Sequence, residues 1–284
     1  MAPALPRRLM FWASLAWCAL PALAQPSPEG YRFSPVNQFG IQLTAEHWNP
    51  IIQYVSEKSG VKLQLKIGRT SADTTSYVLA QEVEFVFSNH LFSPEREKLG
   101  WKVIARRQLP PIHGQIAVMA DSPITQLSQL KDQDVVFPGP EALVSYKFPY
   151  AHLLSQGIDI KVQFGGNTDG ALAQLVSGKV KAAGVNSQLL EGYAKREGKQ
   201  FRVLWSSDPL YDLALMASSK VPDKDVKAVA EAFIGMAKDP KGQQILHRTS
   251  ELVKMPADAV FIASNGSEYA AYRKFYQNAP AQLR

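Results

Sequence analysis

The sequence contains almost no cysteine: among 284 residues the single thiol belongs to Cys18. One cysteine cannot form a disulfide within the chain, and loss of the segment that holds it would exclude thiolate metal sites and cysteine nucleophiles. The fold must therefore be stabilised by a hydrophobic core. Apolar residues make up 46% of the chain, which over this length suffices for one or two cores without covalent cross-links.

Long hydrophobic runs are also lacking. Beyond the N-terminal segment, no stretch approaches the roughly 20 apolar residues of a membrane-spanning helix. The formal net charge of the whole sequence is only +6, and lysines and arginines alternate with acidic residues. The charge therefore favours neither nucleic acid nor a membrane surface as a partner.

Motifs of catalysis and metal binding are absent as well. The five histidines show no metal-ligand spacing, and the sequence has no nucleophile elbow, no phosphate-binding loop and no close pair of carboxylates. We therefore predict a protein that is not an enzyme and that needs no metal and no cofactor. An enzyme whose catalytic residues lie far apart in the sequence is the less favoured alternative.

The N-terminus has the pattern of a secretory signal peptide. Two arginines precede an apolar run from Leu9 to Leu20, and Ala22-Leu23-Ala24 forms a small-x-small cleavage site. We predict that cleavage after Ala24 removes residues 1–24. The mature chain is then expected to begin with a flexible stretch over residues 25–30 and to work in the periplasm.

Short apolar runs typical of β-strands alternate with amphipathic helical patterns along the rest of the chain. Nine runs predict strands, at residues 62–66, 84–88, 102–106, 114–119, 134–137, 161–164, 181–185, 202–205 and 213–217. Apolar residues at helical spacing predict helices over residues 46–58, 169–177 and 225–238, with Asp169 as the N-terminal cap of the second. This alternation predicts an α/β fold.

The length of the mature chain favours two lobes over one long sheet, because it is close to the size at which single cores stop growing. Lobe 1 is expected to comprise residues 31–120 and, after a return crossing, residues 207–284. Lobe 2 is expected to comprise residues 121–206. Ligands of α/β sheets bind at the carboxyl ends of the strands, so a ligand site is predicted in the cleft between the lobes.

The segment from Asp134 to Asp159 has the pattern of a strand, a sharp turn and a helix start. Pro138-Gly139-Pro140 interrupts an apolar strand, and helical spacing follows from Leu143. Backbone N–H groups at a helix start and the positive end of the helix dipole attract carboxylate, phosphate or sulfate. An anion site is therefore predicted at this turn, and an ordinary strand-to-helix connection is the alternative.

Several short motifs occur in the order and spacing of one protein family. They are Trp48-Asn49-Pro50-Ile51 with Tyr54 and Gly60, Phe137-Pro138, Pro149 with Leu153 and Gly157-Ile158-Asp159, Gly166-Asn167-Thr168-Asp169 before Gly178, and Asp239-Pro240-Lys241-Gly242-Gln243-Gln244-Ile245-Leu246. Through them the chain resembles the periplasmic solute-binding proteins of the phosphate, phosphite and phosphonate transporter family over most of its mature length. The resemblance implies a two-lobed, type II periplasmic binding fold that closes on its ligand like a hinged trap.

The sequence departs from this family at the ligand side chains. The resemblance implies a cluster of serine and threonine hydroxyls in the central turn, but that cluster falls on residues 142–145, where only Ser145 carries a hydroxyl. Each hydrogen bond to a charged group contributes roughly 1.5–3 kcal/mol. Weak phosphonate binding is therefore expected, and Glu141 would repel a dianion if it faced the cleft. A less charged or larger ligand is favoured.

Polar residues that follow predicted strands are the candidate ligand-binding residues, because strand ends form the walls of the cleft. They are Asn37, Arg69, Thr70, Ser71, Asn89, His90, Ser145, Asn167, Thr168, Asn186 and Tyr211. Arg69 could hold an anion bidentately, and a solvated surface arginine is the alternative. For Asn37, Asn89 and Thr168 the alternative is local capping of backbone groups. For Tyr211 it is packing at the hinge.

The sequence therefore predicts a monomeric periplasmic solute-binding protein that captures a small anionic or polar ligand. The expected ligands are phosphonate, phosphate, another oxyanion or an organic acid, and the expected partner is an inner-membrane ABC importer. A sensory subunit that presents its ligand to a membrane sensor kinase is the second hypothesis. A neighbouring permease and ATPase gene pair would favour the importer, and a sensor-kinase gene would favour the sensor.

Overall fold

The computed structural model describes Met1 and residues 30–284, so the predicted signal peptide and its cleavage site, like residues 25–29 of the predicted flexible start, lie outside the described residues. The strands are β1 (Tyr31–Pro35), β2 (Leu63–Leu65), β3 (Phe85–Ser88), β4 (Lys102–Gln108), β5 (Gly114–Met119), β6 (Asp134–Phe137), β7 (Lys161–Phe164), β8 (Ala182–Asn186), β9 (Phe201–Ser206), β10 (Ala214–Ala217) and β11 (Val260–Ala263). The α-helices are α1 (Ile41–Ser59), α2 (Asp73–Leu79), α3 (Pro94–Glu97), α4 (Phe148–Ser155), α5 (Thr168–Val176), α6 (Ser187–Glu197), α7 (Asp223–Gly235), α8 (Pro240–Leu252) and α9 (Ala270–Asn278). The short helices are η1 (Leu127–Leu130), η2 (Leu143–Lys147), η3 (Ser267–Tyr269) and η4 (Ala281–Leu283), of which η2 is a π-helix.

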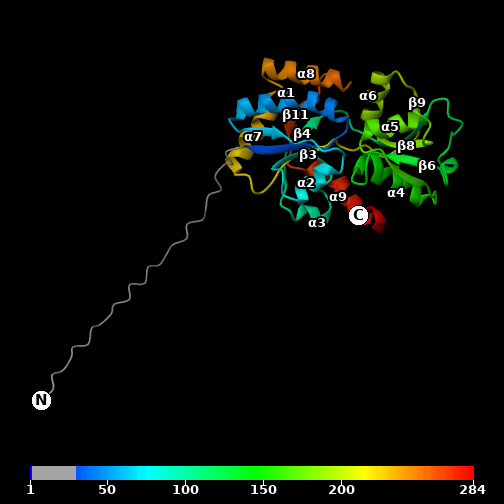
Figure 1. Cartoon of the computed structure of the whole chain (residues 1–284), viewed down its shortest axis with the longest axis horizontal. Coiled ribbons are helices and arrows are strands. Elements are labelled where there is room, and N and C mark those ends of the chain that lie inside the picture. Colours follow the sequence, from blue (N-terminus) through cyan, green and yellow to red (C-terminus); the bar gives the residue numbers. More distant parts are fainter. Residues whose placement is uncertain (2–29) are drawn as a thin grey trace.

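These elements form two lobes, each built on one sheet (Figure 1). Within residues 30–284, lobe 1 has a six-stranded sheet of order β11-β4-β10-β3-β1-β2, and lobe 2 has a five-stranded sheet of order β7-β6-β8-β5-β9. β1 pairs in parallel with β2 and β3, as β6 does with β7 and β8, while β10 and β5 pair antiparallel with both neighbours. Helix-flanked mixed sheets in two lobes confirm the predicted α/β fold.

The nine predicted strands are all present, and those at residues 114–119, 134–137 and 161–164 have the predicted bounds. β1 and β11 lie outside the nine predicted strands. β1 carries Arg32 at its one exposed position and Pro35 at its end, so neither strict alternation nor an apolar run marks it. β11 is a four-residue strand at the edge of the sheet, too short to give a periodic signal.

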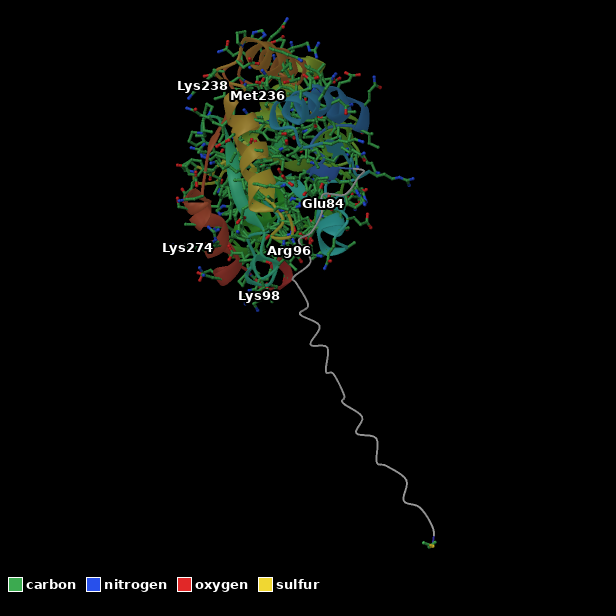
Figure 2. The ribbon with its side chains drawn as sticks, turned by 90° about the vertical axis from the view of Figure 1, so that its left-hand side faces the viewer. Glu84, Arg96, Lys98, Met236, Lys238 and Lys274 are labelled. Atoms are coloured by element: carbon green, nitrogen blue, oxygen red, sulfur yellow. The ribbon has the colours of Figure 1, made fainter. Side chains whose placement is uncertain are left out.

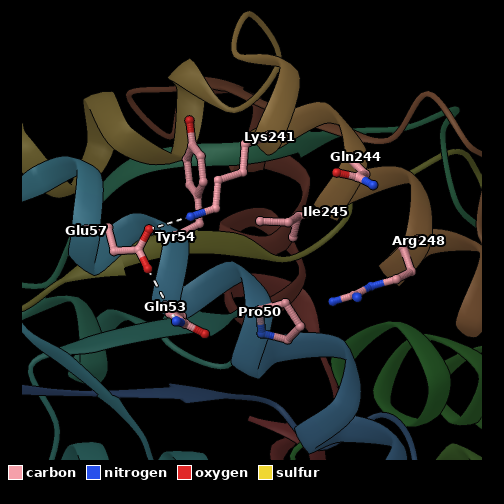
Figure 3. A pocket seen from close by; sticks show the side chains of 8 residues that line it. All are labelled: Pro50, Gln53, Tyr54, Glu57, Lys241, Gln244, Ile245 and Arg248. Carbon is pink, nitrogen blue, oxygen red and sulfur yellow. Dashed lines mark hydrogen bonds and ion pairs between the residues drawn. The ribbon is translucent and has the colours of Figure 1, made fainter.

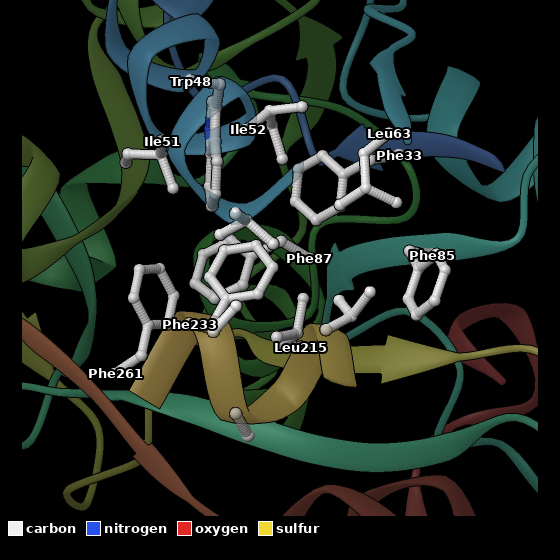
Figure 4. Packing of buried hydrophobic residues seen from close by; sticks show 14 of the residues in the cluster. Phe33, Trp48, Ile51, Ile52, Leu63, Phe85, Phe87, Leu215, Phe233 and Phe261 are labelled. Atoms are coloured by element: carbon white, nitrogen blue, oxygen red, sulfur yellow. The ribbon is translucent and has the colours of Figure 1, made fainter. Parts of the chain in front are cut away.

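The core of lobe 1 lies between its sheet and helices α1 and α7 (Figure 4). The ring centroid of Trp48 in α1 lies 5.0 Å from that of Phe33 and 5.1 Å from that of Phe87. Phe233 of α7 joins the same cluster, with its ring centroid 4.9 Å from that of Phe261. Full burial of a Phe or Leu side chain contributes about 1.5–3 kcal/mol, and such packing stabilises a fold that lacks disulfides.

Helices cover both faces of the lobe 1 sheet (Figure 1). Helix α1 packs against α7 and α8 on one face, whereas α2, α3 and α9 lie on the other. Figure 2 shows the two layers from the side, with Met236 and Lys238 after α7 at one end and Lys98 and Lys274 of the opposite layer at the other. Among the helices that the structure describes, none is long and apolar enough to span a membrane.

Within residues 30–284, three segments connect the lobes. The chain crosses between them at residues 109–113 and 207–213, which are joined by an antiparallel bridge. The third connection is made by the end of the chain: after α9 has packed against lobe 1, Ala279 and Leu283 are buried in the core cluster of lobe 2. The end of the segment 207–284, expected in lobe 1, therefore also contacts lobe 2.

The start of α5 differs from the prediction. Asn167, not Asp169, is the N-terminal cap, and its side chain accepts a hydrogen bond from Gly170 N–H at 2.8 Å. A cap residue must lie just outside the helix with an extended backbone, as Asn167 does with φ −154°. Asp169 lies inside the first turn, where its carboxylate binds Arg196 at 2.6 Å.

Candidate functional site

A small cavity lies between the lobes, next to the carboxyl ends of β1, β3, β6 and β8. Its volume is about 40 Å³, and since one buried water needs roughly 10–15 Å³, it has room for a few waters or a ligand of a few heavy atoms. The lining residues are Val36, Asn37, Gln38, Ser71, Asn89, His90, Ile112, Pro138, Ala142, Leu143, Val144, Ser145, Thr168, Asn186, Leu189, Asp212 and Leu213. They include seven of the eleven residues proposed from the sequence.

The strand-turn-helix segment singled out in the sequence forms one wall of this cavity. After β6, the chain lines the cavity with Pro138 and residues 142–145, and the helix begins as η2 before it continues as α4. The π-helical turn is closed by a hydrogen bond from Lys147 N–H to Ala142 C=O at 3.1 Å. Because the first N–H groups of a helix have no partner inside it, this wall offers backbone donors to a ligand.

Two glycines in neighbouring strands fix the position of this turn. A Cβ atom on Gly114 would lie 2.4 Å from the carbonyl oxygen of Val144. A Cβ atom on Gly184 would lie 2.4 Å from the carbonyl oxygen of Ser145 and 2.2 Å from the ring of Phe137. Distances below 3.0 Å do not occur for real Cβ atoms. The turn therefore rests directly on β5 and β8, which only glycine permits at these two positions.

Ser71 brings an unpaired hydroxyl to the cavity from lobe 1. The residue is 2% exposed, and its hydroxyl has no hydrogen-bond partner among the described residues. Its backbone N–H donates to Gly166 C=O of lobe 2 at 2.7 Å, which fixes the loop at the boundary between the lobes. A buried polar group without a partner costs about 1–3 kcal/mol, so an acceptor on a ligand would remove a cost that the protein already carries.

Asn37, also in the lining, has a mainly structural role. Its side-chain NH₂ donates to Gly68 C=O at 3.0 Å, and its side-chain oxygen accepts from the Thr44 hydroxyl at 2.6 Å. The residue thereby joins the loop after β1, the first turn of α1 and the loop after β2. Both the NH₂ group and the oxygen of the Asn37 side chain are therefore bound within lobe 1, as the capping alternative for Asn37 expected.

His90 and Asn89 follow β3 and are both buried. Burial lowers the pKa of His90 to about 3, so the imidazole is neutral at physiological pH. Its Nδ1 atom lies 3.0 Å from the Thr75 hydroxyl, which leaves Nε2 for a ligand. Asn89 shares a hydrogen bond with the hydroxyl of Tyr272 in α9, so it also serves to anchor the C-terminal helix.

Lobe 2 contributes two more hydroxyls and an amide. Ser145 and Thr168 are 6% and 3% exposed and line the cavity. The backbone N–H of Thr168 also donates across the cleft to Gln38 C=O at 3.2 Å. Asn186 caps α6, where its side-chain oxygen accepts from Gln188 N–H at 2.9 Å. Its NH₂ group is left as a donor.

Asp212 is a lining residue that the sequence analysis missed. It lies in the return crossing, and the guanidinium of Arg107 is 3.9 Å from its carboxylate, with both side chains buried. Burial raises the pKa of Asp212, while Arg107 and the N–H of Leu213 act in the opposite direction. Its neighbour Tyr211 was proposed instead, and the only signal for Asp212 was its place in the same crossing.

Arg107 is held behind Asp212 by aromatic rings. Its guanidinium carbon lies 4.8 Å from the ring centroid of Phe87 and 5.6 Å from those of Trp48 and Phe261. One guanidinium nitrogen also lies 3.4 Å from Nε2 of His47. The guanidinium is therefore shielded from water but keeps its positive charge, because arginine does not lose its proton in proteins.

Four residues proposed from the sequence do not line the cavity. Arg69 is exposed, and its backbone N–H donates to the Asp73 carboxylate at 2.6 Å. Thr70 donates its hydroxyl to the same carboxylate at 3.0 Å. Asn167 is occupied as the cap of α5. Tyr211 is 42% exposed and packs under an arginine of β4. The surface alternative therefore describes Arg69 and the packing alternative describes Tyr211, whereas Thr70 and Asn167 hydrogen-bond within their own segments.

The lobes are joined on one flank of the cavity by an ion pair. Arg96 of α3 donates to both carboxylate oxygens of Glu141, at 2.5 and 3.0 Å, and to His90 C=O at 2.7 Å. Burial acts to raise the pKa of Glu141, but the hydrogen bond and charge of Arg96 outweigh it and the pKa is lowered. The carboxylate expected to repel an anion from the cleft is instead neutralised at the boundary between the lobes.

A second ion pair lies on the other flank. Asp169 of α5 binds Arg196 of α6 at 2.6 Å and also accepts a hydrogen bond from Gly40 N–H of lobe 1. Arg196 in turn donates to Val253 C=O of lobe 1 at 3.2 Å and lies over the ring of Phe39. With contacts on both flanks and at Ser71, the lobes are closed around the cavity.

A larger hollow lies on the outside of lobe 1 between α1 and α8 (Figure 3). Its volume is about 270 Å³. Two of its charged groups satisfy each other, because Lys241 Nζ lies 2.6 Å from the Glu57 carboxylate, to which Gln53 also donates at 3.3 Å. It involves one lobe only and no strand ends. The cavity between the lobes is therefore the candidate functional site.

Comparison with solved structures shows the same fold in known binding proteins. PhnD1 from Prochlorococcus marinus in complex with methylphosphonate is 16% identical, with a TM-score of 0.75 over 88% of this chain and 98% of that one. A binding protein component of an ABC phosphonate transporter from Pseudomonas aeruginosa is 15% identical, with a TM-score of 0.75 over 87% and 86%. The periplasmic aliphatic sulphonate binding protein SsuA from Escherichia coli is 16% identical, with a TM-score of 0.54 over 90% and 95%.

Sequence comparison gives the family. No curated protein matches the chain significantly. The family described as ABC transporter, phosphonate, periplasmic substrate-binding protein matches residues 33–254, a range that contains every residue lining the cavity between the lobes. The chain therefore belongs to the periplasmic substrate-binding proteins of phosphonate ABC transporters.

Proposed function

We propose that this protein captures a small tetrahedral oxyanion, an alkylphosphonate or a compound of the same shape, between its closed lobes. The observation that carries the proposal is the unpaired hydroxyl of Ser71 in a buried cavity. A phosphonate or sulfonate oxygen is an acceptor of the kind that this hydroxyl lacks. The ligand would leave the protein unchanged, as is usual for a binding component.

Donors from both lobes support an oxyanion. Three hydroxyls, those of Ser71, Ser145 and Thr168, line the cavity together with the amide of Asn186 and the neutral imidazole of His90. The backbone N–H groups at the start of η2 add donors along the opposite wall. Weak phosphonate binding was expected because only Ser145 of the turn carries a hydroxyl, but Ser71 and Thr168 also line the cavity and would supply hydroxyls from outside the turn.

The size of the cavity favours a ligand of few atoms. A volume of about 40 Å³ supports a ligand of a few heavy atoms over the larger organic ligand expected from the sequence. PhnD1 was solved with methylphosphonate and SsuA is described as an aliphatic sulphonate binding protein. A methyl or short alkyl group on a phosphoryl or sulfonyl centre would fit against Leu143 and Leu189 of the lining.

The partner of this family is an ABC transporter. We therefore favour delivery of the ligand to an inner-membrane permease over presentation to a sensor kinase, because no feature of the described residues points to a kinase. The proposed site of action is the periplasm, after cleavage of the signal peptide at Ala24. We propose that the protein acts as a monomer, since one chain closes the whole cavity.

Calorimetric titration of the protein purified after export would test the ligand class. We expect methylphosphonate, methanesulfonate or phosphate to bind in the micromolar range or more tightly, and citrate not to bind. Recovery of the ligand unchanged, seen by ³¹P NMR, would agree with a binding role, and its conversion would indicate an enzyme. Failure of every small oxyanion to bind would refute the proposal.

The substitution Ser71→Ala would test the residue that carries the proposal. Loss of one hydrogen bond to a charged group should weaken binding by roughly tenfold to a hundredfold. The fold should keep its stability, because the hydroxyl has no partner within the described protein. Ser76→Ala, on the exposed side of α2, is the matched control and should bind like the parent. Equal affinity of both variants would remove Ser71 from the site.

A further inference from the structure

The charged side chains buried around the cavity do not balance. Among the described residues, the fully buried charged side chains are two cations, Arg107 and Lys147, and one carboxylate, Asp212. The half-buried Arg96 and Arg196 on the two flanks are paired with Glu141 and Asp169. One positive charge is therefore left without a counter-charge in the closed structure.

Lys147 is the cation without a partner. The other three form the pairs Arg96–Glu141 at 2.5 Å, Arg196–Asp169 at 2.6 Å and Arg107–Asp212 at 3.9 Å. Lys147 forms no ion pair with any residue of the described chain. Its ammonium group lies 3.5 Å from the hydroxyl of Tyr276 and 4.9 Å from the centroid of the same ring. A phenol and a ring face do not neutralise a charge.

Lys147 belongs to the turn that borders the ligand site. It follows Ser145 by two residues on η2 and is only 5% exposed. Burial lowers the pKa of Lys147, an effect that Glu141 opposes and Arg96 reinforces. Since a buried cation without a counter-charge is costly, an anion bound against the same turn would stabilise both the cation and the closed lobes.

From this imbalance we propose that the natural ligand carries a single negative charge and that Lys147 is the residue that sets this charge. The inference rests on the proposed function, because it assigns a charge to the oxyanion in the same cavity. A monoanion leaves the closed site neutral. A dianion leaves an excess negative charge in a region of low dielectric, next to the carboxylate of Asp212. Sulfonates and singly ionised phosphonates fit this requirement.

The groups that face Lys147 keep their protonation states near neutral pH. Arg96 holds Glu141 ionised, and the pKa of His90 is lowered by burial to about 3. Burial also raises the pKa of the Tyr276 hydroxyl. Burial lowers the pKa of Lys147, and a bound anion would act in the opposite direction and favour its charged form. Methanesulfonate keeps its charge between about pH 6 and pH 8.5, so its pH profile reports any titration of the protein, and the difference from methylphosphonate reports the ligand.

Ligands of fixed and variable charge separate the possibilities in a calorimetric titration of the parent protein. Methanesulfonate is a monoanion and sulfate a dianion throughout this range, whereas a phosphoryl group loses its second proton near neutral pH, at about 6 for a phosphate ester. We expect methanesulfonate to bind at least about tenfold more tightly than sulfate at every pH. Methylphosphonate should weaken by about tenfold for each pH unit above its second pKa.

Charge-changing variants should move this selectivity in opposite directions. Lys147→Met should weaken methanesulfonate by at least about tenfold, because the closed site becomes negative when the ligand binds. Glu141→Gln should raise the affinity for sulfate relative to methanesulfonate by a similar factor. The double variant should recover the selectivity ratio of the parent, even if its lobes close less tightly. Lys195→Met, an exposed lysine of the same lobe, is the matched control and should leave the ratio unchanged.

The outcomes separate this inference from the proposed function. Tighter methylphosphonate binding at higher pH, or tighter binding of sulfate than of methanesulfonate, would overturn the charge assignment and leave oxyanion capture intact. Binding of no small oxyanion would overturn both. If Lys147→Met does not fold, the pH profile of the parent protein still decides the ligand charge.

Discussion

The closed position of the lobes predicts that the ion pair between Arg96 and Glu141 sets ligand affinity without touching the ligand. The double variant Arg96→Gln and Glu141→Gln removes one charge of each sign, so the net charge around the site stays the same. The ligand of a hinged binding protein is held by the closed form. Loss of a contact that exists only in that form should therefore lower the apparent affinity.

The expected size of the effect follows from the geometry of the pair. The two side chains are 20% and 21% exposed and meet at 2.5 and 3.0 Å. Exposed pairs contribute about 0–1 kcal/mol, whereas breaking a buried pair costs about 3–5 kcal/mol. After allowance for solvent screening, a two-pronged pair at this depth should contribute about 1–2 kcal/mol. Ligand affinity should then fall by roughly 5- to 30-fold.

A second ion pair of the same depth provides the control. Arg106 and Glu268 meet at 2.9 Å with both side chains 17% exposed, but they join β4 to η3 within lobe 1. Replacing both with glutamine should lower the free energy of unfolding and leave ligand affinity within about twofold. Calorimetry would give the affinities, and small-angle scattering would show whether the lobes still close. Equal losses of affinity in both double variants would refute a role in closure.

Three further predictions concern the support of the site. Gly184→Ala places a Cβ 2.2 Å from the ring of Phe137 in β6, so it should lower the free energy of unfolding by about 1–3 kcal/mol and weaken ligand binding. As the control, a Cβ at Gly235 meets no atom within 4 Å, so Gly235→Ala should raise the free energy of unfolding by up to about 1 kcal/mol, measured by thermal unfolding. His47 and His90 have pKa values of about 3 when folded, against 6.5 when unfolded. Between these pH values the unfolded chain binds more protons than the folded chain, so the free energy of unfolding falls as the pH drops below about 6.5. The fall is up to about 1.4 kcal/mol per pH unit for each histidine. In urea titrations, His90→Asn should make the free energy of unfolding depend less steeply on pH. Asp212→Asn leaves a buried arginine unpaired and should lower the urea-derived free energy of unfolding by about 3–5 kcal/mol, and an unchanged value would contradict the pairing.

Short apolar runs predicted the central strands because these are buried on both faces, as β3, β8 and β10 are over their full length. The predicted bounds of β5 and β6 agree with the structure. β1 lies outside the nine predicted strands because its stability comes from pairing with β2 and β3 on either side, not from its own sequence. Long-range pairing of this kind leaves no local signal in a single chain.

The sequence predicted the site where a residue directly follows a strand and failed where a loop decides the direction of a side chain. His90 ends β3 and lines the cavity as proposed. Arg69 lies in a longer loop, where Asp73 binds its backbone N–H and the side chain stays in solvent. In the return crossing, Tyr211 and Asp212 point in different directions. The buried arginine behind the cavity, far away in the sequence, fixes which of the two faces inward.

The central turn carries apolar residues where the family resemblance implies hydroxyls. Leu143 and Val144 occupy positions where the family resemblance implies hydroxyls, and both are buried in a cluster with Phe92 and Tyr272 of lobe 1. Full burial of such an apolar side chain contributes about 1.5–3 kcal/mol, which is comparable to a hydrogen bond to a charged ligand. The apolar contacts stabilise the closed form whichever ligand is bound, whereas hydroxyls would stabilise it only with a ligand that accepts their hydrogen bonds. In the proposed site, these apolar residues strengthen the contacts between the lobes in place of contacts with the ligand. Selectivity would then depend on the backbone donors, on Ser71 and on the charge balance of the closed site.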